Sequence, residues 1–113
     1  MCGILGTLPK TEHCIFKHAL DTLKHRGPDD FGVETVNNEI TLGHRRLSIV
    51  DIDHGHQPMF DNTKRYSVVF NGEIYNFIEI KKELEGLGCR FKSNSDTEVL
   101  LNAYIKWNEI GRA

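Results

Sequence analysis

The sequence predicts an α+β protein with mainly antiparallel strands. Two strand-like segments, 31–36 and 39–44, flank Asn37 and Asn38, a pair typical of a hairpin turn. Three further segments carry apolar residues at the three- and four-residue spacing of amphipathic helices. Because a hairpin joins antiparallel neighbours, this mixture of helices and strands favours an antiparallel sheet.

The remaining strands are predicted from short apolar runs. Residues 3–8 form such a run, which ends at Pro9 and is typical of a buried strand. The run 66–70 contains Val68, Val69 and Phe70 and predicts the strongest strand. Residues 47–50 are expected to extend the second strand of the hairpin.

Helix signals complete the pattern. Helices are expected at 11–24, 77–87 and 96–108. Gly88 is expected to end the second helix, and the turn 93–96 to supply the N-cap of the third. The expected buried residues are Ile15, Phe16, Ala19, Leu20 and Leu23 in the first helix and Val99, Leu100, Ala103, Tyr104 and Trp107 in the last. Residues 51–63 are rich in Asp, His, Gly, Pro and Asn and predict a long functional loop or lid.

Composition limits the function. The 113 residues allow one small domain, and 14 basic against 16 acidic side chains argue against a nucleic-acid partner. No apolar run approaches the roughly 20 residues that span a membrane, and no signal peptide is recognisable. Three widely spaced cysteines form no disulfide framework, which indicates a reducing, cytoplasmic compartment.

Cys2 stands directly after the initiator methionine. Removal of that methionine would leave a thiol and a free α-amine on one residue. An α-amine has a pKa of roughly 8, so it can accept the thiol proton near neutral pH and activate the sulfur as a nucleophile. The alternative is an ordinary thiol in a buried first strand.

Asn71-Gly72-Glu73 follows the strongest predicted strand. The side-chain amide of Asn71 and the backbone N–H of Gly72 could point at one position, as an oxyanion hole requires. An ordinary Asn-Gly turn is the alternative. The helical pattern that follows argues against a simple hairpin.

Arg45 and Arg46 are adjacent in a strand-like run, so one of them must point inward. A buried guanidinium needs a carboxylate, which either the protein or a substrate could provide. With Glu73 and Asp96 facing an ammonium group, one arginine would complete a clamp for an α-amino acid. These residues alone leave the choice between the two arginines open.

Other polar residues are weaker candidates. Residues 25–30 form either a surface turn or the wall of a site. His54 and His56 lack the further ligands of a metal site, so no metal is expected. Cys14 and Cys89 are interpreted as ordinary thiols.

Taken together, these motifs resemble the glutaminase domain of class II glutamine amidotransferases, which are N-terminal-nucleophile hydrolases. Among them the chain is most similar to the asparagine synthetase branch. The resemblance lies in five blocks: Met1-Cys2-Gly3-Ile4, His25-Arg26-Gly27-Pro28-Asp29, Arg46-Leu47-Ser48-Ile49-Val50-Asp51, Asn71-Gly72-Glu73-Ile74-Tyr75-Asn76 and Ser95-Asp96-Thr97-Glu98-Val99. It implies an αββα sandwich of mainly antiparallel sheets, expected to be incomplete in a chain of this length.

The resemblance also implies roles for individual residues. Cys2 would attack the side-chain amide of glutamine, with Asn71 and Gly72 stabilising the oxyanion. Arg46 would hold the substrate carboxylate, and Glu73 and Asp96 would face its amino group. The pocket lining would include Leu47, Ser48, Ile49 and Val50.

The implied partners follow from the same family. Ammonia would pass to a synthetase domain or partner chain, with activated aspartate as acceptor, and a homo-oligomer is compatible with this. No cofactor is expected in residues 1–113, because ATP and Mg²⁺ would belong to a synthetase domain that these residues do not include. The alternative is a truncated, catalytically silent fragment or a structural module that depends on a partner.

Overall fold

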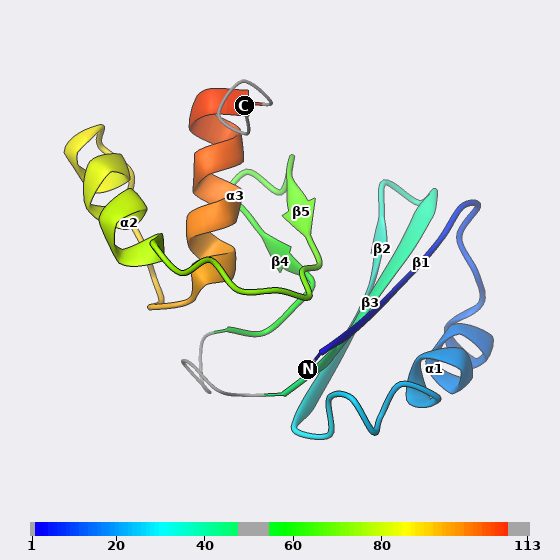
Figure 1. The fold of residues 1–113 in the computed structure, drawn as a ribbon. Helices are drawn as coiled ribbons and strands as arrows, with labels where there is room; N and C mark the ends of the chain where they lie inside the picture. Colours follow the sequence, from blue (N-terminus) through cyan, green and yellow to red (C-terminus); the bar gives the residue numbers. More distant parts are fainter. Residues whose placement is uncertain (1, 48–54, 109–113) are drawn as a thin grey trace.

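The computed structural model describes residues 2–47 and 55–108. One helix follows the first strand, four strands come next and two helices end the described chain, and both sheets are antiparallel, which confirms the α+β class (Figure 1). The elements are β1 (Gly3–Thr7), α1 (His13–Asp21), β2 (Asp30–Val36), β3 (Ile40–Arg46), β4 (Met59–Phe60), β5 (Ser67–Val68), α2 (Phe77–Gly86) and α3 (Asp96–Trp107). None of the helices in the described ranges is long and apolar enough to cross a membrane.

The main sheet has the strand order β1-β3-β2, with both pairs antiparallel. The predicted hairpin is confirmed: Asn37 and Asn38 have positive φ angles of 53° and 58°, and Glu39 N–H donates to Val36 O at 3.0 Å. Two consecutive residues with positive φ match the twist of the flanking strands, and asparagine tolerates this conformation well. The turn therefore sets the register of β2 on β3.

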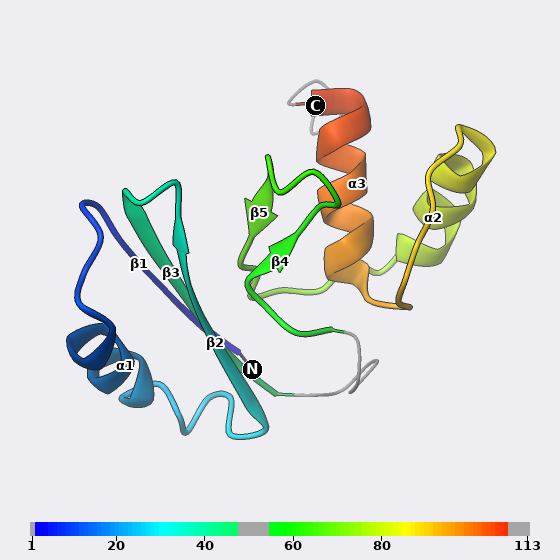
Figure 2. The same cartoon turned by 180° about the vertical axis from the view of Figure 1, so that it is seen from behind.

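Helix α1 covers one face of the main sheet, opposite β4 and β5 (Figure 2). It buries Phe16 and Leu20 against β3 near Gly43. The helix is shorter than expected, and Ile15 is 61% exposed, so its assignment to the buried face is wrong. With only nine residues, α1 contacts the sheet along a narrow stripe, and Ile15 lies about 100° around the helix from Phe16.

The predicted strand 66–70 is wrong in length, because only Ser67 and Val68 pair with β4. Phe70 instead has both backbone groups bonded to side chains: its N–H donates to Gln57 Oε1 and its carbonyl oxygen lies 3.1 Å from His44 Nε2. The expected extension 47–50 is wrong at Leu47, because β3 ends at Arg46, and residues 48–50 lie outside the described ranges.

The expected caps of both later helices are confirmed. After α2, Gly88 has a φ of 94°, and the N–H groups of Gly88 and Cys89 donate to Glu85 O and Leu84 O, each at 3.0 Å. This is the Schellman arrangement that glycine favours. At the start of α3, Ser95 Oγ accepts a hydrogen bond from Thr97 N–H at 3.1 Å.

The buried face of α3 differs from the predicted one. Its buried residues are Thr97, Glu98, Val99 and Leu101, whereas Tyr104 is 39% exposed. The carboxylate of Glu98 points inward because it accepts hydrogen bonds from Lys92 N–H, Ser93 N–H and Ser93 Oγ–H. Because these bonds satisfy its carboxylate, Glu98 belongs to the buried face of α3, which the sequence pattern had predicted to be purely apolar.

We expect Gly43→Ala to destabilise the protein by about 1–3 kcal/mol, because the added methyl group would overpack the core. A Cβ atom there would lie 2.5 Å from Cε1 of the buried Phe16. Gly86→Ala is the matched control: its Cβ would meet nothing within 4 Å, and alanine stabilises a helix by up to about 1 kcal/mol over glycine. Urea unfolding measures both, and equal shifts of the two variants would contradict this packing.

Candidate active site

A cleft of about 420 Å³ opens where the ends of β1 and β3 meet the segment after β5 and the start of α3. Its volume falls within the roughly 300–1,000 Å³ typical of small-molecule sites. Many of the residues singled out in the sequence line it: Cys2, Arg46, Leu47, Asn71, Gly72, Glu73 and Asp96. Chain segments that are far apart in the sequence therefore converge on one site.

The Cys2 thiol lies beside the end of β3. Gly3 pairs with Arg45 in the β1–β3 ladder, so continuing the register by one residue sets Cys2 opposite Arg46. The backbone N–H of Leu47 donates to Cys2 Sγ at 3.4 Å. The thiol also lies 3.9 Å from Leu47 O, so both backbone groups of Leu47 hold the sulfur at the end of β3.

The loop 25–30 anchors the backbone of the same cysteine. Arg26 Nε donates to the carbonyl oxygen of Cys2 at 3.0 Å. Asp29 N–H in turn donates to Arg46 O at 3.0 Å, so the loop runs along the end of β3. None of residues 25–30 lines the cleft, so the loop is not a wall of the site, but its contacts hold the backbone of two residues that do line it.

The segment 70–74 carries the Asn-Gly pair along the cleft. It is held at its start by the bonds to Phe70, and at its end Ile74 N–H donates to Asp96 Oδ2 at 3.1 Å. Helix α2 begins at Phe77, so the pair is not the turn of a hairpin. An Asn side chain and a Gly N–H held at both ends are suitable donors for a developing negative charge.

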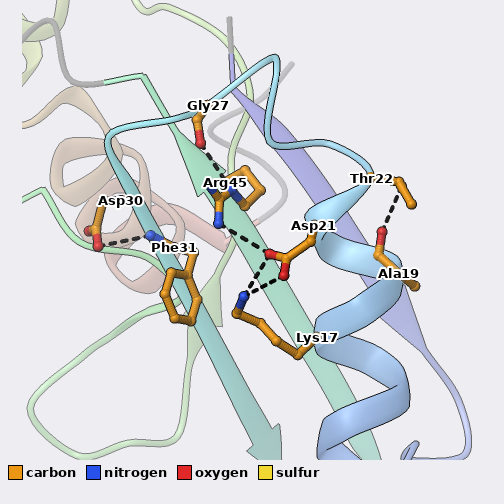
Figure 3. Close-up of polar contacts among 8 residues, drawn as sticks. All are labelled: Lys17, Ala19, Asp21, Thr22, Gly27, Asp30, Phe31 and Arg45. Atoms are coloured by element: carbon orange, nitrogen blue, oxygen red, sulfur yellow. Dashed lines mark hydrogen bonds and ion pairs between the residues drawn. The ribbon is translucent and has the colours of Figure 1, made fainter.

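The two adjacent arginines point to opposite faces of the main sheet. Arg45 lies on the α1 side, where Nη1 is 3.3 Å from Asp21 Oδ1 and Nε donates to Gly27 O at 3.0 Å (Figure 3). Arg46 lines the cleft with Cys2. Both are almost fully buried, at 4% and 5% exposure. Alternation along β3 therefore places Arg46, and not Arg45, at the cleft.

The charges around the cleft suit a zwitterion. Arg46 contributes a positive group, while Glu73 and Asp96 contribute negative ones. Asp96 is the first residue of α3 and is fixed by the bond from Ile74, whereas Glu73 is exposed. A carboxylate and an ammonium group on one small molecule could therefore each find an opposite charge.

The other sequence candidates either lie outside the described residues or have contacts away from this cleft. Ser48, Ile49, Val50 and His54 lie outside the described residues. His56 Nδ1 lies 2.6 Å from Asp30 Oδ2, and Cys14 is exposed on α1. Among residues 2–47 and 55–108, no group of three or more His, Cys, Asp or Glu side chains is arranged to hold a metal ion.

Sequence reasoning missed three residues around the site: Arg26, His44 and Gln57. Arg26 was visible only as part of a loop. His44 is two residues before Arg46, so strand alternation could have assigned it to the same face. Gln57 stands in an irregular segment that carries no periodic signal, and only its contacts reveal it.

Comparison with known families identifies the family of this chain. The chain belongs to the glutamine amidotransferase domain family, whose model matches residues 1–111. The family expected from the five sequence blocks is thereby confirmed.

Similar curated proteins are glutamine-hydrolyzing asparagine synthetases. Asparagine synthetase 3 of Bacillus subtilis (strain 168) is 41% identical over 96% of this chain, and the match covers 19% of that protein. Asparagine synthetase 1 of the same organism is 40% identical over 96% of the chain and 18% of its own length. The enzyme of Triphysaria versicolor is 38% identical over 96% of the chain and 19% of its own length. The chain thus spans about a fifth of these relatives.

We expect Asp21→Asn to reduce the loss of stability on acidification. Hydrogen bonds from Lys17 hold the pKa of Asp21 below its ordinary value of 3.8, and the charges of Lys17 and Arg45 act in the same direction. A lowered pKa in the folded state stabilises the fold above pH 4 and ceases to do so as the pH falls through it.

Urea midpoints measured from pH 7 to pH 2.5 test this expectation. The wild-type and Asp21→Asn curves should differ most near neutral pH and converge in acid. The exposed Glu85→Gln serves as the control for loss of one surface carboxylate. Parallel curves for wild type and Asp21→Asn would contradict a stabilising role of this carboxylate.

Proposed function

We propose that this chain is the glutaminase region of a glutamine amidotransferase and hydrolyses the side-chain amide of glutamine to glutamate and ammonia. The observation that carries this proposal is the convergence of Cys2, Arg46, Asn71, Gly72 and Asp96 on one cleft. Membership of the glutamine amidotransferase domain family supports the same substrate.

In the proposed mechanism, removal of Met1 gives Cys2 a free α-amine. This amine takes the thiol proton while Sγ attacks the amide carbon of glutamine. Asn71 and Gly72 donate hydrogen bonds to the resulting oxyanion. When the intermediate collapses, the C–N bond breaks, the α-ammonium returns its proton to the leaving nitrogen, and ammonia departs. Water then hydrolyses the thioester, releasing glutamate and restoring the thiol.

The proposed contacts with glutamine use the charges of the cleft. Arg46 pairs with the α-carboxylate, for which a planar guanidinium offers two parallel donors. Asp96 and Glu73 face the α-ammonium group. Leu47, Ser48, Ile49 and Val50 complete the lining in this proposal, although the last three lie outside the described residues.

The same proposal extends to fold and context. The main sheet with α1 on one face and β4–β5, α3 and α2 beyond the other supports an N-terminal-nucleophile hydrolase fold, an αββα sandwich. By analogy with the asparagine synthetases, ammonia would pass to a synthetase domain that uses ATP and Mg²⁺ to activate aspartate. Three free thiols support a cytoplasmic location.

We expect Cys2→Ala to abolish glutamate release from glutamine, because it removes the nucleophile. Cys14→Ala is the matched control, since that thiol is exposed on α1 and should leave release unchanged. Glutamate is measured in a coupled assay, and the intact mass of each preparation establishes whether Met1 has been removed.

Two outcomes would contradict this assignment. Glutamate release that survives Cys2→Ala would exclude Cys2 as the nucleophile. A folded wild-type chain that lacks Met1 and still releases no glutamate would favour the non-enzymatic alternative, a module that acts only with a partner.

We expect Arg46→Lys to raise the KM for glutamine about 10- to 100-fold with a smaller change in kcat. Lysine keeps the charge but loses the paired donors for a carboxylate, and a contact kept from ground state to transition state appears in KM. Arg45→Lys is the control, because Arg45 pairs with Asp21 on the other face and should leave KM within about twofold. Equal effects of the two variants on KM would refute the assignment.

A further inference from the structure

The backbone of Phe70 is held by two side chains from distant parts of the chain. Gln57 Oε1 accepts a hydrogen bond from Phe70 N–H at 2.6 Å, and the carbonyl oxygen of Phe70 lies 3.1 Å from His44 Nε2. Phe70 directly precedes Asn71 and Gly72. In an ordinary strand these two backbone groups would pair with a neighbouring strand.

We propose that His44 and Gln57 are positioning residues that fix the oxyanion donors of the cleft through the backbone of Phe70. This inference rests on the proposed glutaminase function and deepens it. Neither side chain needs to touch the substrate: their effect passes through one peptide unit to the Asn71 amide and the Gly72 N–H.

The two bonds to Phe70 act as a clamp on residues 70–74, which carry the proposed oxyanion donors. This segment needs the clamp because no strand pairs with it within the described residues. The β4–β5 pairing ends at Val68, two residues before Phe70. Beyond the donors, the backbone is held by the bond from Ile74 N–H to Asp96 Oδ2. Oxyanion donors act only when they are already aimed at the developing charge, so loosening the Phe70 end should misplace them.

His44 is a rigid support. It is fully buried in β3, the central strand, with Ile4 opposite it on β1 and Gly32 opposite it on β2. It shares a face of β3 with Arg46, which lines the cleft. Strand β3 therefore carries the proposed carboxylate-binding Arg46 and also, through His44 and Phe70, supports the proposed oxyanion donors.

Gln57 is equally constrained. Its Nε2 donates to Thr97 Oγ1 at 3.1 Å, which connects Phe70 to the first turn of α3. Its backbone carbonyl lies so close to β2 that a Cβ atom on Gly32 would be 2.0 Å away. Only glycine permits that approach, so Gly32 lets Gln57 reach Phe70.

The unsatisfied atom of His44 also points to a role beyond packing. To donate to Phe70 O, Nε2 must carry the proton, which leaves Nδ1 as an acceptor, and this buried atom has no hydrogen-bond partner among the described residues. Burial lowers the pKa of His44 and so favours this neutral form. The charges of Arg46 and His56 also lower the pKa, whereas the hydrogen bond to Phe70 O and the charge of Asp30 raise it. A buried polar atom without a hydrogen-bond partner costs free energy of folding. A histidine at this position therefore indicates that its one hydrogen bond, to Phe70 O, has a role of its own.

The test compares His44→Leu and Gln57→Leu with His44→Gln in the full chain. His44→Leu removes the donor at similar volume, whereas the amide of His44→Gln can still donate from the Nε2 position. We expect each leucine variant to lower kcat for glutamine about 10- to 100-fold with KM changed less than about threefold, below the 10²–10³ loss for a direct oxyanion donor. His44→Gln should recover kcat to within about fivefold of wild type.

A second readout separates positioning from general damage. Iodoacetamide alkylates a thiol by displacement at a saturated carbon and forms no oxyanion, so its rate with Cys2 should stay within about twofold of wild type in every variant. Unchanged kcat in both leucine variants would overturn the proposal. So would alkylation that falls by the same factor as kcat, since that indicates a disrupted site.

A third readout does not depend on activity. If the wild-type chain releases no glutamate, the proposed function fails, but the clamp is still decided by ¹⁵N relaxation of the backbone. Order parameters of Asn71 and Gly72 should fall from about 0.85 towards 0.6 in the leucine variants, while those of Leu42 and Gly43 stay constant. Unchanged values at Asn71 and Gly72 would overturn the clamp independently of any chemistry.

Discussion

The antiparallel pairing of β3 with its two neighbours determines which side chains of the main sheet reach the cleft. Because side chains alternate along a strand, His44 and Arg46 share the cleft face while Gly43 and Arg45 face α1. The register with β1 brings Cys2 to the end of the strand, where Leu47 N–H meets its sulfur. A slip of one residue would exchange the faces and remove Arg46 from the cleft.

The two faces of the sheet perform different tasks. On the α1 side, Phe16 packs close to Gly43. The same side contains the Arg45–Asp21 ion pair, and Asp21 also pairs with Lys17. On the cleft side, polar groups connect the sheet to irregular backbone. Buried arginines cost stability unless they are paired, and Asp21 provides a carboxylate for Arg45 on the α1 side, whereas Arg46 lines the cleft on the other side.

Irregular backbone carries much of the chemistry, and side chains replace regular hydrogen bonding there. Residues 70–74 have no strand partner in the described part of the chain, and their restraints come from His44, Gln57 and Asp96. Such segments can aim both a side-chain amide and a backbone N–H at one position, which a regular ladder would not allow. Rigidity then depends on a few specific bonds.

Local chemistry explains which elements were predictable. The Asn37-Asn38 hairpin, the Gly88 terminus and the Ser95 cap depend on conformational preferences of a few neighbouring residues, and all three are confirmed. The strand 66–70 was overestimated because a strand is only as long as its partner, and β4 provides two residues. The sequence could not predict that the Glu98 side chain points inward. Its hydrogen-bond donors, the N–H groups of residues 92 and 93, are brought to it only when the chain is folded.

By itself, the sequence determined the kinds of group available: a cysteine after the initiator methionine, an Asn-Gly pair after a strand and two adjacent arginines of which one points inward. The family membership now established was also readable from the five sequence blocks. The resemblance implied Arg46 rather than Arg45, and the tertiary structure shows that Arg46 lines the cleft; only the tertiary structure revealed the contacts of Arg26, His44 and Gln57 around it. The physical reason is that strand periodicity separates two faces but does not say which one a distant segment will cover.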